Sequence, residues 1–155
     1  MRKIEGLEDS FKDSKIIYLV TFGPDGEKHS RPMTNFNDTP YHTIWFPTYK
    51  ETRKVKDIKS NDEVLLIFPH KEKEKFFKLK GKAGFEDQEV TQEKWRWWYL
   101  YWRPEISDKF WFEKRGEHEE RMIINVEPLE ATILSKEQVE YISKPYKSIM
   151  PEKRL

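Results

Sequence analysis

The stretch that decides the fold reads Phe76-Phe77-Lys78-Leu79-Lys80-Gly81-Lys82-Ala83-Gly84-Phe85-Glu86. Every second residue from Phe77 to Phe85 is apolar or small, and lysines occupy three of the positions between them. Because successive side chains of a β-strand point to opposite faces, this period predicts a half-exposed strand over residues 76–86. Glycine on the apolar face is typical of close packing or of a bend.

Segments on both sides of this stretch also predict strands. Residues 16–22 are β-branched and aromatic, which indicates a buried strand, and residues 63–69 indicate a central one. The turn residues Gly-Pro-Asp-Gly at 23–26 predict a hairpin that returns through residues 27–36. Three more strands are expected at residues 41–48, 120–126 and 128–134.

Helical patterns are few and short. An apolar spacing of three and four predicts a helix before Ser14, and residues 51–59 predict a short amphipathic helix. Ser135 and Gln138 form a capping box that opens a last short helix. Six or seven strands with few helices predict one domain over residues 1–155, a mainly β, antiparallel barrel or sandwich.

Residues 91–103 are unusual because one helical face consists of large aromatic residues. Its members recur at helical spacing, and Pro104 ends the pattern: Trp95, Trp98, Tyr99 and Trp102. A small domain can hardly enclose such a helix alone, so we expect it at a subunit interface or over a ligand. Packing at a subunit interface is the favoured interpretation.

Composition excludes several classes of function. Lys+Arg is 29 and Asp+Glu is 28, a net charge of +1, whereas general nucleic-acid binders are far more basic. The absence of cysteine excludes disulfides, thiolate metal sites and a cysteine nucleophile. The four histidines lack zinc-ligand spacing, so no metal site is expected. No signal-peptide core or membrane-length apolar run is found, so we expect a cytoplasmic protein.

The segment from Trp45 to Lys54 carries the clearest chemical signal. A strand ends at Thr48, and a helix is expected to open near Thr52, Arg53 and Lys54. Cations at a helix N-terminus oppose the macrodipole, but a bound phosphate dianion would reverse the sign of this effect. Taken alone, a solvated basic turn is the simpler interpretation.

The segment from His29 to Phe36 contains Arg31 followed by Pro32. Proline within a strand indicates an edge or an interrupted ladder. Backbone groups freed there could bind a planar ligand, and a plain edge strand is the alternative.

Several motifs in order resemble the pyridoxamine 5′-phosphate oxidase-like flavin-binding split barrels, most closely their general-stress-protein branch. The resemblance runs from about residue 14 to residue 134. It is carried by Leu19-Val20-Thr21-Phe22 with Asp25-Gly26, Ser30-Arg31-Pro32-Met33, Trp45-Phe46-x-Thr48-x-x-x-Thr52-Arg53-Lys54, then Asn61, Val64 and Phe68, and Gly81-x-Ala83.

This resemblance implies a six-stranded antiparallel split β-barrel, a homodimer with FMN at the subunit interface. By position, Arg53 and Lys54 would hold the FMN phosphate, and Thr52 and Arg31 would assist at the phosphate and ribityl end. The isoalloxazine would be lined by the segment Pro32-Met33-Thr34-Asn35 and by the Pro47-Thr48 edge.

Three departures bear on the reaction. The chain closes with Lys144–Pro151 in place of the oxidase's arginine-rich signature, which argues against pyridoxamine phosphate as the substrate. Pro47 removes one backbone donor, and Phe76 stands where the oxidase carries a polar flavin contact.

Three functions follow from the sequence. The first is a flavin-dependent oxidoreductase acting on an unknown small molecule, with no catalytic residue assigned. The second is a non-catalytic binder of flavin, deazaflavin or haem, for example in stress. The third, less favoured, is binding of single-stranded nucleic acid along Lys78, Lys80 and Lys82.

Overall fold

The computed structural model describes residues 1–72, 74–102 and 120–143, and the side chains of residues 98–102 and 140–143 lie outside this description. In chain order the elements are α1 (Leu7–Asp13), β1 (Ile16–Phe22), β2 (Lys28–Thr34), β3 (Ile44–Tyr49), α2 (Arg53–Ser60), β4 (Glu63–Pro69), β5 (Lys75–Phe85), α3 (Gln88–Trp102), β6 (Arg121–Ser135) and α6 (Lys136–Ser143).

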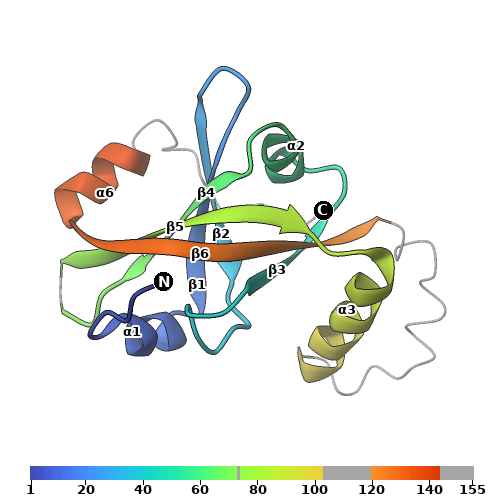
Figure 1. Cartoon of the computed structure of the whole chain (residues 1–155), viewed down its shortest axis with the longest axis horizontal. Coiled ribbons are helices and arrows are strands. Elements are labelled where there is room, and N and C mark those ends of the chain that lie inside the picture. The colour runs from blue at the N-terminus through green and yellow to red at the C-terminus, as the bar shows by residue number, and fades with distance from the viewer. Residues whose placement is uncertain (73, 103–119, 144–155) are drawn as a thin grey trace.

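The described strands form one curled antiparallel sheet. Its order is β2-β1-β4-β5-β6-β3, so β2 and β3 are the two edges although they follow each other in the chain. Figure 1 shows the long strands β5 and β6 crossing in front of β1, β2 and β4, with α1 and α2 at opposite ends of β1. This arrangement is a six-stranded split half-barrel, as predicted.

The core lies inside the curl. Strand alternation directs Leu19, Leu66 and Leu79 inward, and these residues pair directly across β1, β4 and β5. From β5, Phe77, Leu79 and Ala83 are buried, while Lys82 is exposed and Lys78 and Lys80 are half-buried. The alternation that opened the sequence analysis therefore sets which face of β5 forms the core.

The predicted strands 120–126 and 128–134 are a single strand, β6, and the expected break between them is wrong. The β5–β6 register shifts at this point: Lys80 pairs with Glu130, but Gly81 pairs with Pro128. The extra residue makes a bulge, where a proline without an N–H is tolerated. A Cβ atom at Gly81 would clash with Val126 Cγ1 and lie 3.0 Å from the Glu127 carbonyl oxygen, so the close crossing requires glycine.

Several other predicted elements are confirmed. Strands β1 and β4 have the predicted bounds, whereas β2 and β3 are shorter than predicted, with β3 beginning three residues later than expected. The capping box of α6 is present, because Ser135 N donates to Gln138 Oε1 at 2.8 Å and Gln138 N donates to Ser135 Oγ at 3.4 Å.

Helix α3 packs on β6 through Trp95. Its indole Nε1 donates to the Met122 carbonyl at 3.0 Å, and the buried Arg121 guanidinium lies 4.8 Å from the ring centroid. Tyr49 of β3 also packs against Trp95, and the centroids of the two rings lie 5.3 Å apart. Trp97 is 71% exposed, and the side chains of Trp98, Tyr99 and Trp102 lie outside the description, so the proposed subunit or ligand contact of this helix stays a prediction.

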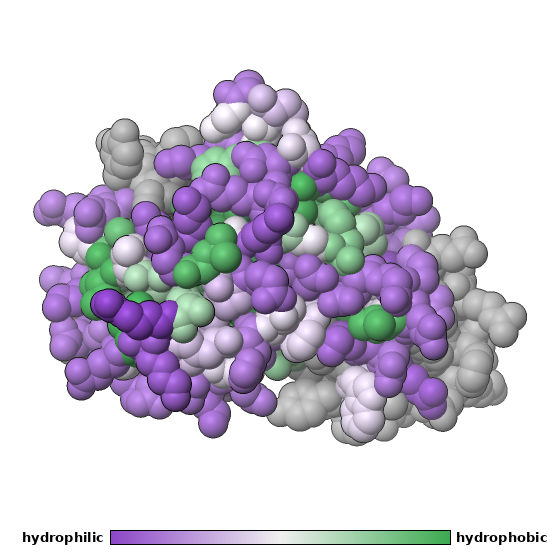
Figure 2. Space-filling model, viewed as in Figure 1, coloured by the Kyte–Doolittle hydropathy of each residue, from purple (hydrophilic) through white to green (hydrophobic). Residues whose placement is uncertain are grey.

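The face of the molecule seen in Figure 2 is mainly hydrophilic. Figure 2 shows small, separate hydrophobic areas on the visible face, as expected for a chain in which 37% of residues are charged. None of the helices within the described residues is both long and apolar enough to span a bilayer.

Candidate functional site

Polar side chains are buried at the end of the half-barrel that α2 covers. They come from four consecutive elements of the chain, β1, β2, β3 and α2, and each is at most 4% exposed: Thr21, Arg31, Thr48, Lys54 and Asp57. Buried charged groups are rare in proteins unless they are paired or serve a ligand, so this end is the candidate site.

Strand register places the β1 and β2 members of this cluster. Arg31 pairs with the core residue Leu19, and His29 pairs with Thr21, so the Arg31 and His29 side chains share the inward face. The tight turn at residues 23–26 brings the two strands together. The hairpin thereby delivers a hydroxyl, an imidazole and a guanidinium to the interior beneath α2.

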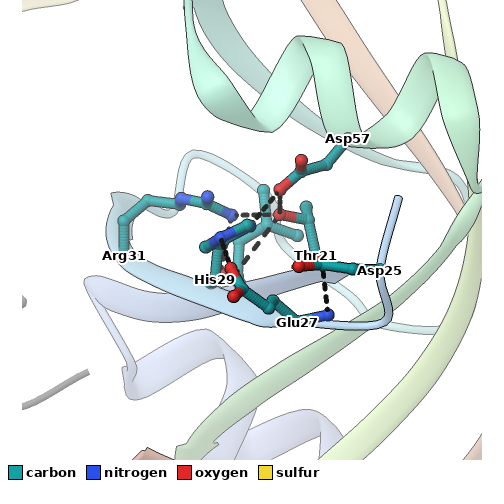
Figure 3. Close-up of polar contacts among 7 residues, drawn as sticks. Thr21, Asp25, Glu27, His29, Arg31 and Asp57 are labelled. Atoms are coloured by element: carbon teal, nitrogen blue, oxygen red, sulfur yellow. Dashed lines mark hydrogen bonds and ion pairs between the residues drawn. The ribbon is translucent and has the colours of Figure 1, made fainter. Parts of the chain in front are cut away.

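A continuous hydrogen-bond network joins these groups to α2 (Figure 3). Arg31 Nη1 donates to Thr21 Oγ1 at 2.8 Å and to the Leu19 carbonyl at 3.3 Å. Thr21 Oγ1 donates to Asp57 Oδ2 at 2.7 Å, and His29 Nδ1 lies 2.7 Å from the same oxygen. On its other side, His29 Nε2 is 3.5 Å from the exposed Glu27 carboxylate.

Helix α2 buries a face that is half apolar and half charged. Its buried residues are Lys54, Val55, Asp57 and Ile58. Ile58 packs in the main core, while Lys54 and Asp57, three positions apart, lie on neighbouring turns of one helical face. The helix therefore closes the barrel and places a cation and a carboxylate inside it.

Two further features of this end fit an anion. The buried Thr48 hydroxyl has no hydrogen-bond partner among the described residues. Thr52, the residue before α2, makes no side-chain cap, because its hydroxyl donates to the Tyr49 carbonyl at 3.0 Å. An orphaned buried hydroxyl and an uncapped helix N-terminus are both groups that a ligand oxygen could satisfy.

The predicted cofactor residues fall into separate groups. Arg31, Thr48 and Lys54 are brought to the interior at the α2 end, whereas Arg53 is exposed at the start of the helix. Pro32, Thr34 and Pro47 are half-buried and alternate with inward-facing residues, so they lie on the outer side of the edge strands β2 and β3.

Two predicted residues are engaged elsewhere. Met33 packs in the main core. The Asn35 side chain donates to the Phe11 and Ser14 carbonyls at 3.1 and 3.0 Å and accepts from Asn37, which ties β2 to α1. The contacts of Met33 and Asn35 with an isoalloxazine ring stay a prediction. The structure establishes that Met33 packs in the core and that Asn35 holds the Phe11 and Ser14 carbonyls.

Sequence reasoning missed Thr21, His29 and Asp57 as members of the cluster. A threonine in a β-branched strand and an aspartate in a charged helix look ordinary in one sequence. A signal was present for Asp57, because it lies between Val55 and Ile58 on the same side of the helix as Lys54.

The basic strip on β5 is accompanied by acidic side chains. Lys80 Nζ is 3.3 Å from Glu63 Oε1, and Lys82 Nζ is 3.8 Å from Asp62 Oδ2. These ion pairs lower the positive potential that binding of single-stranded nucleic acid would need. Within the described residues no three histidine or acidic side chains gather as a metal site.

Solved structures share this fold at low sequence identity. A Listeria innocua protein with a provisional pyridoxamine 5′-phosphate oxidase name is 21% identical, with 81% of this chain and 93% of that chain covered and a TM-score of 0.60. General stress protein 26 from Bacillus anthracis is 19% identical over 84% of this chain and 92% of that chain, with a TM-score of 0.59.

A protein named F420 reductase is similar to the same degree. It is 20% identical, with 84% of this chain and 98% of that chain covered and a TM-score of 0.59. No curated protein matches the chain significantly.

The sequence comparison extends the likeness to nearly the whole chain. Residues 2–153 match the family described as "Pyridoxamine 5'-phosphate oxidase like". The match includes both edge strands, α2 and the buried polar cluster beneath it. The chain therefore belongs to the pyridoxamine 5′-phosphate oxidase-like family.

Proposed function

We propose that this protein binds FMN and acts as a flavin-dependent oxidoreductase on a small molecule. The observation that carries the proposal is a set of buried groups at α2: Lys54 lies on the helix, Arg31 is joined to it through Thr21, and the orphaned Thr48 hydroxyl lies on the strand that leads to its uncapped start. A phosphate dianion suits this set, because it accepts several charge-assisted hydrogen bonds at once.

The residues would divide the binding between them. Arg31 and Lys54 would hold the phosphate from the interior, Thr48 would donate its hydroxyl, and Arg53 would approach from solvent. Bound FMN supplies the redox chemistry, and the protein supplies position and access. The outer sides of β2 and β3, with Pro32, Thr34 and Pro47, would lie along the ring.

The homodimer implied by the resemblance is part of this proposal. Ile16 and Tyr18 are 48% and 45% exposed on the outer face of β1, opposite Thr34 and Pro32 of β2. Apolar side chains beside the ring-binding edge offer surface for a second subunit.

A deazaflavin is the second candidate cofactor, since one structural neighbour is named F420 reductase. It competes with FMN for the same site in this proposal. The comparison of cofactors therefore belongs in the first experiment.

The decisive test is a fluorescence titration of cofactor-free protein with FMN, riboflavin and F420. We expect FMN to bind at least about tenfold more tightly than riboflavin, the loss of one charged interaction being worth about this factor. Equal affinity for FMN and riboflavin would contradict the assignment of a phosphate-binding site. Tight binding of F420 alone would show that the cofactor is the deazaflavin and not FMN.

Turnover is measured on the same protein. Reduction of the bound flavin by NADH or NADPH, followed by reoxidation, identifies an oxidoreductase. A bound flavin that neither donor reduces would leave a binding protein without this activity.

A further inference from the structure

We propose that Thr21 and Asp57 are positioning residues that fix the Arg31 guanidinium for the cofactor phosphate. They thereby set the preference for a phosphorylated over an unphosphorylated flavin. This inference rests on the proposed function, because it assumes that Arg31 contacts the phosphate.

The hydrogen bonds of the network have one consistent direction. The single hydroxyl proton of Thr21 has two acceptors within reach, Asp57 Oδ2 at 2.7 Å and the His29 carbonyl at 3.4 Å, and it points to the nearer and charged one, which has only acceptor atoms. The lone pairs of Thr21 Oγ1 are then available to Arg31 Nη1, which donates to it at 2.8 Å. Asp57 therefore determines that Thr21 presents an acceptor, not a donor, to Arg31.

The guanidinium is held at two points. Nη1 donates to both Thr21 Oγ1 and the Leu19 carbonyl, at 2.8 and 3.3 Å, and both acceptors belong to β1. Because the guanidinium is planar, fixing one end of its fork fixes the direction of its other N–H groups. A side chain ordered before binding loses less rotamer freedom when the ligand arrives.

His29 completes the arrangement at the carboxylate. Its Nδ1 is 2.7 Å from the Asp57 oxygen that Thr21 also contacts, and the aspartate side chain is only 2% exposed. The two contacts converge on one oxygen from two strands of one hairpin, as Figure 3 shows. The carboxylate is thus fixed by the same hairpin that carries Arg31.

A charge argument separates positioning from simple electrostatics. A carboxylate near a phosphate site weakens anion binding by repulsion. If Asp57 acted only through its charge, removing it would tighten FMN binding. If it orients Thr21 and Arg31, removing it weakens FMN binding.

The test compares Thr21→Val, Thr21→Ser and the unaltered protein in titrations with FMN and riboflavin. Valine keeps the shape and suits a strand but removes the acceptor for Arg31. We expect Thr21→Val to lower FMN affinity about tenfold and to change riboflavin affinity by less than about twofold. Thr21→Ser keeps the hydroxyl and should retain the unaltered FMN-to-riboflavin ratio.

Loss of general structure would reduce binding of both flavins, so the ratio distinguishes positioning from fold damage. A Thr21→Val protein with an unchanged ratio, beside an unaltered protein that prefers FMN, overturns the positioning role and leaves the proposed function standing. An unaltered protein that binds both flavins equally overturns the proposed function itself.

A second variant keeps the proposal falsifiable if Thr21→Val does not fold. Asp57→Ala removes both the charge and the acceptor of the Thr21 proton. We expect it to lower FMN affinity selectively, and tighter FMN binding would overturn the proposal in favour of the charge effect alone.

Discussion

The two ends of the half-barrel are closed by helices of opposite character. At the α1 end, Leu7 and Phe11 insert into the core, where the centroids of the Phe11 and Phe68 rings lie 5.4 Å apart. Buried polar groups there are neutral, and Ser14 Oγ, for example, donates to the Ser10 carbonyl at 2.7 Å. At the α2 end the buried groups include Arg31, Lys54 and Asp57.

This difference indicates which end was shaped by stability alone. Helix α1 closes its end of the barrel with the apolar side chains Leu7 and Phe11, whose burial removes no charged group from water. Buried ion pairs are often replaceable by apolar residues without loss of stability. The α2 end nevertheless keeps buried charged groups, as expected if the ligand proposed above binds there.

The largest expected effect is on the free energy of unfolding and comes from removing a core side chain at the α1 end. Phe11→Ala removes a fully buried ring, and we expect the free energy of unfolding to fall by about 3–5 kcal/mol. Urea unfolding measures this change. The FMN-to-riboflavin ratio of the folded fraction should stay unaltered, and a shift in that ratio would show that the two ends are coupled.

An intermediate effect is expected at the charged end, on FMN binding. Lys54→Met keeps the length of the side chain and removes a buried cation from the proposed phosphate site. FMN affinity should fall about tenfold or more.

The exposed Lys56 on the same helix provides the matched control. Lys56→Met should leave both FMN affinity and stability nearly unchanged. Equal losses of FMN affinity in the two variants would mean that Lys54 acts only through the net charge of the helix.

The smallest effect concerns a surface charge near α1. Lys75 Nζ lies 2.9 Å from Glu72 Oε2, and this hydrogen bond with the lysine charge, assisted by His70, lowers the pKa of Glu72. A lowered folded-state pKa contributes stability above the ordinary glutamate pKa, and this contribution is lost as the pH falls through the lowered value.

Thermal melts of the unaltered protein and Glu72→Gln test this sign. The difference in Tm at neutral pH should be small, because both side chains are exposed to solvent screening, and it should vanish in acid, where Glu72 is protonated. A difference that grows as the pH falls would contradict the assignment.

The sequence predicted the sheet better than the site. Alternation fixed the buried face of β5, and apolar runs fixed the bounds of β1 and β4, because period and length are local properties. Two strands were expected on either side of Pro128, but the structure has one strand with a bulge there. A bulge depends on the register with the partner strand, which a single sequence does not show.

The site was predicted in part, through the family's motifs. Arg31, Thr48 and Lys54 were named and are buried, but their contacts with a cofactor stay a prediction. Asp57 carried a helical-spacing signal that was missed, whereas Thr21 and His29 could not be found in the same way. Their role depends on a register between strands and on a helix placed 36 residues from Thr21, and neither is a local pattern.

The edge position of β3 has a consequence for the order of folding. Its ladder joins Ile44–Tyr49 to Arg121–Val126, whereas β1 and β2 pair across a short turn. Closing the longer loop is slower, because more chain entropy is lost before any contact forms. We therefore expect the Thr21–His29–Arg31 part of the site to form before Thr48 joins it, so the proposed cofactor site would be complete only after β3 has paired with β6.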